Sequence, residues 1–307
     1  MKKAVITGST SMIGSALVRE CLANGVRVYA VVRSGSPKIA RLPEHENLIL
    51  VEGSLENIDA LPDAIPEECD TFYHIAWGHT GVLRNASCEL QADNILYSLK
   101  AVRAAEKTGC RRFIGAGSQA EYGPKDLDVI GPDTRTEPIN PYGAAKLSAC
   151  LMTKMLCSEI GMEWIWPRIF STYGINDKPT SMISDSVRKM LAGEATHFTP
   201  AIHRWDYLFS RDAGRAFYLM GEKGVPGSIY CIGSGESRPL RLFIEEMAEA
   251  CGVQPDGIGD IPYPKDRPVR NLCADIENLT RDTGFRPETS FRDGIRETVE
   301  FMRKQHG

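Results

Sequence analysis

Short apolar runs alternate with amphipathic stretches through the first half of the chain. The runs are bounded by glycine, proline or polar residues, which predicts buried strands near residues 3–7, 26–32, 48–52, 71–76, 112–117 and 163–169. Between the first two runs, Ile13, Leu17 and Cys21 recur at i, i+4 and i+8, the spacing of an amphipathic helix. Strands that alternate with helices in this way predict an α/β protein with a doubly wound, mostly parallel sheet.

The residues between the first strand and the first helix predict a nucleotide site. Gly8 permits a tight turn, Gly14 lets the helix pack on the strand, and the helix N-terminus favours a pyrophosphate. Strand, glycine turn, helix and strand are the context that a dinucleotide fingerprint requires. Ser11 stands where a middle glycine is usual, so its side chain must point away from the pyrophosphate or hydrogen-bond to it.

A basic residue follows the second predicted strand. An acidic residue is expected about 20 positions after the glycines, where it would hold the ribose 2′-hydroxyl of NAD. Arg33 takes that place and Ser34 follows it. A guanidinium offers forked donors to a phosphate, so we predict a preference for NADP(H), with NAD(H) as the possible alternative cofactor. The competing interpretation of this segment is a solvated basic loop.

A phenol and an ammonium stand four residues apart in a predicted helix. Tyr142 and Lys146 share one helix face, and Ser118 ends the preceding strand. Asn140 and Pro141 read as cap and first helical residue, so a nearby cation and the helix N-terminus are expected to lower the pKa of Tyr142. Such a phenol exchanges a proton with a carbonyl or alcohol. The spacing alone is weak evidence, since a solvated helix with a surface lysine also produces it.

Taken together, the glycine turn, Ser118, Tyr142 and Lys146 resemble the extended short-chain dehydrogenase/reductases, the NAD(P)-dependent epimerase/dehydratase group that acts on nucleotide-activated sugars. Residues 70–76, 113–123, 167–174, 205–212 and 274–275 are similar to further segments of that family. The resemblance implies catalytic roles for Ser118, Tyr142 and Lys146. It also implies a cofactor site formed by Gly8, Ser11, Met12, Ile13, Gly14, Arg33, Ser34, Ser54, Leu55, Ala76, Asn94, Tyr142, Lys146 and Arg168.

The same resemblance implies a division of the chain. Residues 1–174 are expected to form a Rossmann-like domain, and residues 175–307 mainly a smaller α/β substrate-binding lobe, with segments near 205–232 returning to the first domain. Glycine and proline become frequent after Gly174, which agrees with a change of architecture there. The family also implies a homodimer that pairs the helix bearing Tyr142 with the helix near Asn94.

The resemblance implies a nucleotide sugar as substrate. The family's 4,6-dehydratases carry an Asp-Glu pair directly after the position of Ser118, and this chain has Gln119 and Ala120 there. Glu121 is one step away, which in a strand-like segment turns its side chain to the opposite face. We therefore expect reduction of a carbonyl on a nucleotide-linked 4-keto-6-deoxy sugar. A nucleotide-sugar 4-epimerase with bound NAD, and a non-catalytic NADP-binding sensor or scaffold, are the alternatives.

No single motif defines the residues that would contact the substrate. His79 lies in the loop after the fourth strand, which either contacts substrate or is held as a simple loop by Trp77. The other candidates are Ser171, Arg204, Arg267 and Arg270, and each arginine could equally be a surface charge. His74 reads as a satisfied core residue.

Composition narrows the class of protein. The 307 residues carry a formal net charge of −4, nine cysteines without a Cys-x-x-Cys spacing, and six histidines without metal-ligand spacing. We expect reduced thiols, no metal and no nucleic-acid partner. No apolar run approaches about 18 residues and no signal-type segment opens the chain, which predicts a cytoplasmic protein without a membrane span.

Overall fold

A parallel sheet forms the centre of the molecule. The computed structural model describes residues 1–85, 87–263 and 271–306, and within them the main sheet has eight strands. The predicted α/β fold with a doubly wound parallel sheet is confirmed. Seven strands lie side by side, and the short β6 (Gly117–Ser118) pairs with β7. Their order is β11 (Ile229–Ile232), β7 (Glu163–Ile169), β5 (Arg112–Gly115), β4 (Thr71–His74), β1 (Lys3–Thr7), β2 (Arg27–Val32) and β3 (Leu48–Glu52), every pair parallel.

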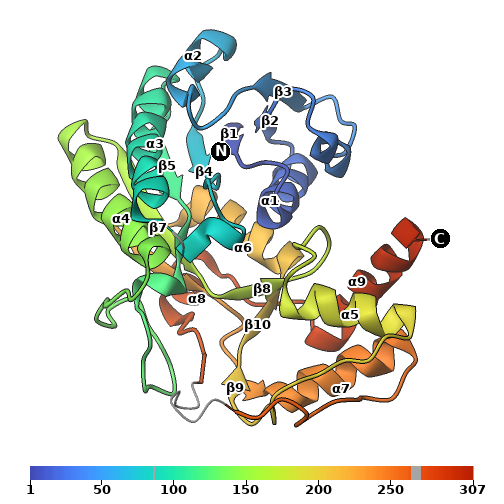
Figure 1. The fold of residues 1–307 in the computed structure, drawn as a ribbon. Helices are drawn as coiled ribbons and strands as arrows, with labels where there is room; N and C mark the ends of the chain where they lie inside the picture. The colour runs from blue at the N-terminus through green and yellow to red at the C-terminus, as the bar shows by residue number, and fades with distance from the viewer. Residues whose placement is uncertain (86, 264–270, 307) are drawn as a thin grey trace.

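Both faces of this sheet are covered by helices. Consecutive residues of a strand point to opposite sides, so Ala4 and Ile6 of β1 face one apolar core and Val5 faces the other. Helices α1 (Met12–Ala23) and α6 (Ser210–Lys223) close the first core, and α3 (Cys88–Lys107) and α4 (Pro141–Glu159) close the second, as Figure 1 shows. Burial on both faces explains why the strands are continuously apolar in sequence.

The turn between β1 and α1 depends on its glycines. Gly8 has φ +68°, and a Cβ atom there would lie 2.7 Å from the backbone nitrogen of Ala76. A Cβ atom on Gly14 would lie 2.1 Å from the Gly8 carbonyl oxygen. Ser11 caps α1, its Oγ accepting a hydrogen bond from the Gly14 N–H at 3.0 Å. The start of α1 is thereby held against the ends of β1 and β4.

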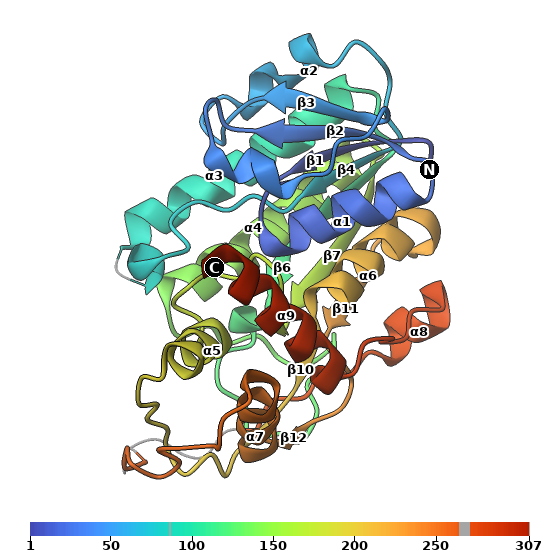
Figure 2. The same cartoon turned by 90° about the vertical axis from the view of Figure 1, so that its right-hand side faces the viewer.

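Three further helices form a separate apolar core. Helices α5 (Met182–Ala192), α7 (Leu240–Cys251) and α9 (Phe291–His306) share it through residues such as Val187, Ile244 and Ile295, and they stand together in the lower half of Figure 2. Two short strand pairs contribute residues to this core: β8 (Ser171–Tyr173) with β10 (Tyr207–Phe209), and β9 (Arg204–Trp205) with β12 (Arg238–Pro239). None of the described helices combines the length and apolarity that crossing a membrane demands.

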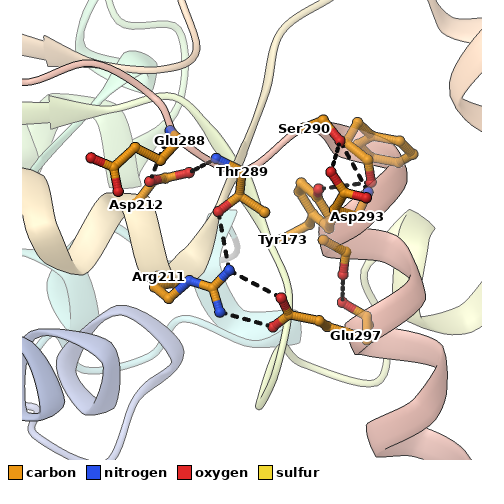
Figure 3. Close-up of polar contacts among 11 residues, drawn as sticks. Tyr173, Arg211, Asp212, Glu288, Thr289, Ser290, Asp293 and Glu297 are labelled. Atoms are coloured by element: carbon orange, nitrogen blue, oxygen red, sulfur yellow. Dashed lines mark hydrogen bonds and ion pairs between the residues drawn. The ribbon is translucent and has the colours of Figure 1, made fainter.

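Polar contacts fasten the chain before and within α9 to α6 (Figure 3). Asp212 is buried, and its carboxylate accepts hydrogen bonds from the backbone N–H groups of Glu288 at 3.2 Å and Thr289 at 2.9 Å. Arg211 forms a two-pronged ion pair with Glu297, both distances being 3.0 Å. The long loop that follows α8 (Glu277–Thr283) is therefore anchored to the helix that packs on α1.

Candidate active site

Ser118, Tyr142 and Lys146 line one cavity of about 560 Å³. Ser118 ends β6, while Tyr142 and Lys146 stand in the first two turns of α4. Asn140 caps that helix and Pro141 is its first residue, as the sequence predicts. The structure thus brings together all three residues for which a catalytic role is expected.

Lys146 points away from the phenol. Its Nζ donates a hydrogen bond to the Ala116 carbonyl oxygen at 2.6 Å and lies 3.5 Å from the ring centre of Trp77, but 5.9 Å from the ring centre of Tyr142. The side chain is buried, and burial lowers the pKa of Lys146 to about 7 despite the nearby Glu121 carboxylate, which raises it. Near neutral pH this amine is therefore only partly protonated.

The pKa of Tyr142 lies above its ordinary value, contrary to the lowering that the sequence predicts. Burial raises it, and this effect outweighs the lowering by Arg84 and by the neighbouring Ser118 hydroxyl. The prediction is wrong in this respect because the Lys146 ammonium is turned toward Ala116 and Trp77. The four-residue spacing places both side chains on one face but does not determine where a long lysine side chain points.

Arg84 is a residue of this cavity that the sequence analysis missed. It lies in η3 (Val82–Asn85), a 3₁₀ turn between β4 and α3, and its guanidinium carbon is 3.9 Å from the ring centre of Tyr142. The loop after β4 was already a candidate for substrate contact. Arg84 lies five positions after His79, so its basic character was the available signal.

A second cavity of about 540 Å³ lies at the glycine turn. Six of the residues expected to bind cofactor line it: Gly8, Ser11, Arg33, Ser54, Leu55 and Ala76. Met12 and Ile13 line the first cavity instead. Ser11, Ile75, Trp77 and Thr80 line both, so the two cavities adjoin beside Trp77. A bound dinucleotide could therefore extend from one cavity into the other.

The second cavity has the chemistry that a dinucleotide needs. The capped N-terminus of α1 opens onto it, and Gly8 lets the backbone approach closely. Arg33 and Lys38 are exposed at its edge, while Glu56 also lines it. The residues present fit NAD(P) as the resident cofactor.

Four residues of the expected cofactor set line neither cavity. Gly14 packs on Gly8, and Ser34 is exposed in the turn after Arg33. Asn94 is buried, and its Oδ1 accepts a hydrogen bond from the Gly78 N–H at 2.6 Å, which holds the loop after β4. Arg168 is likewise buried and is engaged by Glu121. Contact of these four with a cofactor stays a prediction.

Glu121 lies beneath the candidate catalytic serine and is fully buried. Residues Gln119–Glu121 form η4, a 3₁₀ turn, so the prediction of a strand-like segment is wrong. Ser118 caps this turn and forms a capping box with Glu121. The Glu121 carboxylate accepts hydrogen bonds from the Ser118 N–H at 2.8 Å, the Trp166 indole N–H at 3.0 Å and the Arg168 Nε at 2.7 Å. Because its carboxylate is occupied by these three donors, Glu121 stabilises the protein interior. It does not line the cavity.

The expected substrate contacts are dispersed. Ser171 lines the first cavity, where its Oγ accepts a hydrogen bond from the Trp205 indole at 2.9 Å. His79 lines the second cavity instead. Arg204 is exposed and donates to Ser237, outside both linings. Arg267 and Arg270 lie outside the described residues.

The loop and first turn of α5 supply polar groups to the first cavity that the sequence analysis did not identify. Lys178, Thr180, Ser181 and Asp177 line it, together with Tyr207 from β10. No motif marks these residues, because the segments that carry them come together only in the tertiary structure.

His74 is buried with its Nδ1 3.0 Å from the Thr7 hydroxyl, which makes it the satisfied core residue that was predicted.

A doubly wound parallel sheet with a glycine turn at its first strand, and Ser, Tyr and Lys at the adjoining cavity, defines an oxidoreductase-type enzyme of the extended short-chain dehydrogenase/reductase class. The chain belongs to the NAD dependent epimerase/dehydratase family, whose model matches residues 4–233.

Relatives from several organisms cover nearly the whole chain. A dTDP-glucose 4,6-dehydratase of Streptomyces niveus is 24% identical over 314 aligned residues, covering 98% of this chain and 93% of its own length. A UDP-glucose 4-epimerase structure from Thermotoga maritima superposes with a TM-score of 0.88 at 23% identity, covering 99% of this chain and 100% of its own. A UDP-N-acetylglucosamine 4-epimerase structure from Methanobrevibacter ruminantium superposes with a TM-score of 0.87 at 25% identity, covering 99% of each chain.

Proposed function

We propose that the protein reduces a carbonyl group of a nucleotide-linked sugar, at C4 of a 4-keto-6-deoxy sugar, with NADP(H) as its cofactor. The observation that carries the proposal is the convergence of Ser118, Tyr142 and Lys146 at a cavity that adjoins the glycine-turn cavity. Convergence of these groups suits proton transfer coupled to hydride transfer, and the nucleotide sugars in the names of the relatives set the expected substrate class.

Each side chain has a distinct part in this reaction. When bound, reduced nicotinamide supplies the hydride that attacks the carbonyl carbon. Ser118 donates a hydrogen bond to the carbonyl oxygen and stabilises the developing negative charge. Tyr142 transfers its hydroxyl proton to that oxygen, which completes the alcohol. Its raised pKa keeps the phenol protonated before the transfer. Lys146, whose Nζ is directed to the Ala116 carbonyl oxygen and away from the phenol, would hold the nicotinamide ribose.

The preference for NADP(H) rests on Arg33. It is exposed at the edge of the glycine-turn cavity, after β2, where an acidic residue would hold an unphosphorylated ribose. A forked guanidinium instead suits a 2′-phosphate, and Lys38 adds a second cation on the same side.

A 4-epimerase is the second candidate, favoured by the two solved relatives that carry this name. An epimerase would retain NAD⁺ and return the hydride to the other face of the sugar. The same three side chains serve both reactions, so only the cofactor preference and the substrate separate them. A 4,6-dehydratase is disfavoured, because Gln119 and Ala120 replace its acid pair and the Glu121 carboxylate is occupied in the core. A non-catalytic sensor would have no need of the proton-transfer groups.

The deciding experiment follows absorbance of NADPH with nucleotide-linked 4-keto-6-deoxy sugars, in parallel with UDP-hexose interconversion in the absence of added cofactor. Reduction requires substrate-dependent NADPH loss with one alcohol formed for each NADPH consumed. Tyr142→Phe should abolish this turnover and leave NADPH binding within a few-fold. Interconversion of UDP-hexoses by protein purified with NAD⁺ would replace the reductase proposal with the epimerase.

We further propose that residues 1–174 bind the cofactor and that residues 175–307 mainly bind the sugar nucleotide, with residues 205–232 returning to the first domain. In support, α6 packs on α1 and β11 joins the sheet beside β7, while α5, α7 and α9 share a core of their own.

The protein is also proposed to dimerise through α3 and α4. These adjacent helices expose large apolar side chains: Leu96 at 59%, Leu151 at 50%, Met152 at 44% and Met155 at 69%. Such a surface is typical of an interface between subunits. Sedimentation of the wild-type protein should give a dimer, and Leu151→Glu combined with Met155→Glu should give a monomer. A wild-type monomer at micromolar concentration would refute this assembly.

A further inference from the structure

Arg84 places a positive charge on the face of the candidate catalytic phenol. Its guanidinium carbon lies 3.9 Å from the ring centre of Tyr142, within the range of a cation–π contact. Within the described part of the chain, no carboxylate forms an ion pair with Arg84. Its Nε is shielded from solvent and has no hydrogen-bond acceptor there. Among the described residues, its charge therefore acts on the phenol without a carboxylate partner.

The other charged groups around Tyr142 do not replace this contact. Lys146, from α4, lies 5.9 Å from the ring centre and is directed to Ala116. Glu121, from η4, raises the pKa of Tyr142, although that carboxylate is already paired with Arg168. Ser118, from β6, is neutral. A guanidinium is charged throughout the physiological pH range, whereas burial lowers the pKa of Lys146 to about 7. Of the guanidinium groups in the described residues, Arg84 is the one in cation–π contact with Tyr142.

Tyr142 lies between one cationic contact and one aromatic contact. The Arg84 guanidinium lies over its ring, and the edge of the ring meets Trp77, with 6.1 Å between ring centres and 80° between ring planes. Trp77 is fixed in turn by a hydrogen bond from its indole N–H to Gln91 at 2.9 Å. The orientation of the phenol in the cavity thus depends on Arg84 from one side.

We propose that Arg84 is a positioning residue for Tyr142, and that its guanidinium both orients the phenol and stabilises the phenolate that proton transfer leaves behind. This inference rests on the proposed function for its catalytic meaning, since it assigns a group acting on the same proton donor. In the reduction direction the O–H bond of Tyr142 breaks, its proton passes to the substrate oxygen, and the negative charge left on the phenol faces Arg84. Reprotonation restores the neutral phenol.

The test measures Tyr142 ionisation directly, without any substrate. The ultraviolet absorbance of tyrosinate is titrated in the wild-type protein and in Tyr142→Phe, and the difference isolates Tyr142 from the other nine tyrosines. The same pair is prepared in an Arg84→Met background, which preserves side-chain length and removes the charge. Arg84→Lys restores a cation, and Arg241→Met, which removes an exposed charge on α7, is the matched control.

In Arg84→Met, the ratio of ionised to neutral Tyr142 at a given alkaline pH is expected to fall roughly ten-fold or more, because an opposite charge within about 4–6 Å typically moves a pKa by at least one unit. Arg84→Lys should recover part of the loss, and Arg241→Met should show none. Identical Tyr142 titrations in wild type and Arg84→Met would overturn the inference, as would a Tyr142 that never ionises before wild type unfolds.

Turnover supplies a separate readout. If the protein reduces nucleotide keto-sugars, Arg84→Met should lower kcat and move the alkaline limb of its pH profile to higher pH, with the affinity for NADPH unchanged. A shifted Tyr142 titration with no turnover on any sugar would count against the proposed function while leaving the role of Arg84 in place.

Discussion

The buried ion pair beneath Ser118 offers the sharpest test of the structure. Glu121 is fully buried and Arg168 nearly so, with 2.7 Å between the carboxylate Oε2 and the guanidinium Nε. Glu121→Gln keeps the shape of the side chain but removes its charge. It also turns an amide toward at least one of the three donors that the carboxylate now satisfies. Arg168 would be left as a buried cation without its counter-charge.

Breaking one partner of a buried ion pair typically costs about 3–5 kcal/mol. For a chain of this size, that loss corresponds to a decrease in Tm of roughly 6–10 °C. Because the Glu121 carboxylate also accepts the Ser118 N–H, the variant should lose activity beyond its loss of stability.

The assay is urea unfolding of wild type, Glu121→Gln, Arg168→Met and the double variant. The double variant should be more stable than the sum of the single losses predicts, since it contains no unpaired charge. Glu245→Gln is the matched control. It breaks an exposed pair with Arg241 at 2.9 Å on α7, and such pairs contribute at most about 1 kcal/mol. A Glu121→Gln protein no less stable than Glu245→Gln would refute this reasoning.

Three further outcomes are expected. Arg33→Ala should weaken NADPH binding roughly ten-fold or more, because a charged hydrogen bond to phosphate is worth about 1.5–3 kcal/mol. NADH binding, measured in parallel by isothermal titration calorimetry, should not change, and equal losses for both cofactors would contradict the assignment of Arg33 to the 2′-phosphate. Asp212→Ala should lower the free energy of unfolding by about 2–4 kcal/mol, since two backbone N–H groups lose their acceptor, and Asp212→Asn should lose less. Burial lowers the pKa of Lys146 to about 7, so the folded protein binds fewer protons than the unfolded chain between pH 7 and the ordinary lysine value of 10.5. Its stability relative to Lys146→Met should therefore rise with pH across that window in urea unfolding, and a flat difference would show that Lys146 titrates normally.

The pattern of the chain determined the architecture. Apolar runs and helical spacing predicted six of the eight described strands of the main sheet, and β1, β3 and β7 begin and end where expected. Gly8 and the cap at Asn140 were readable because a turn or helix start depends on a few neighbouring residues. The arrangement of Ser118 with Tyr142 and Lys146 followed from local position, at a strand end and along one helix face.

Tertiary packing decided what these groups do in the site. Arg84 and Tyr142 are far apart in sequence, and nothing periodic links a 3₁₀ turn to the first turn of α4. Lys146 is long enough to reach Ala116 or the phenol, and Trp77 determines which it meets. Burial, which raises the pKa of Tyr142 and lowers that of Lys146, depends on atoms from distant segments. Local spacing therefore placed Tyr142 and Lys146 on one helix face, and the packing around them determined which other groups they meet, their charge and their direction.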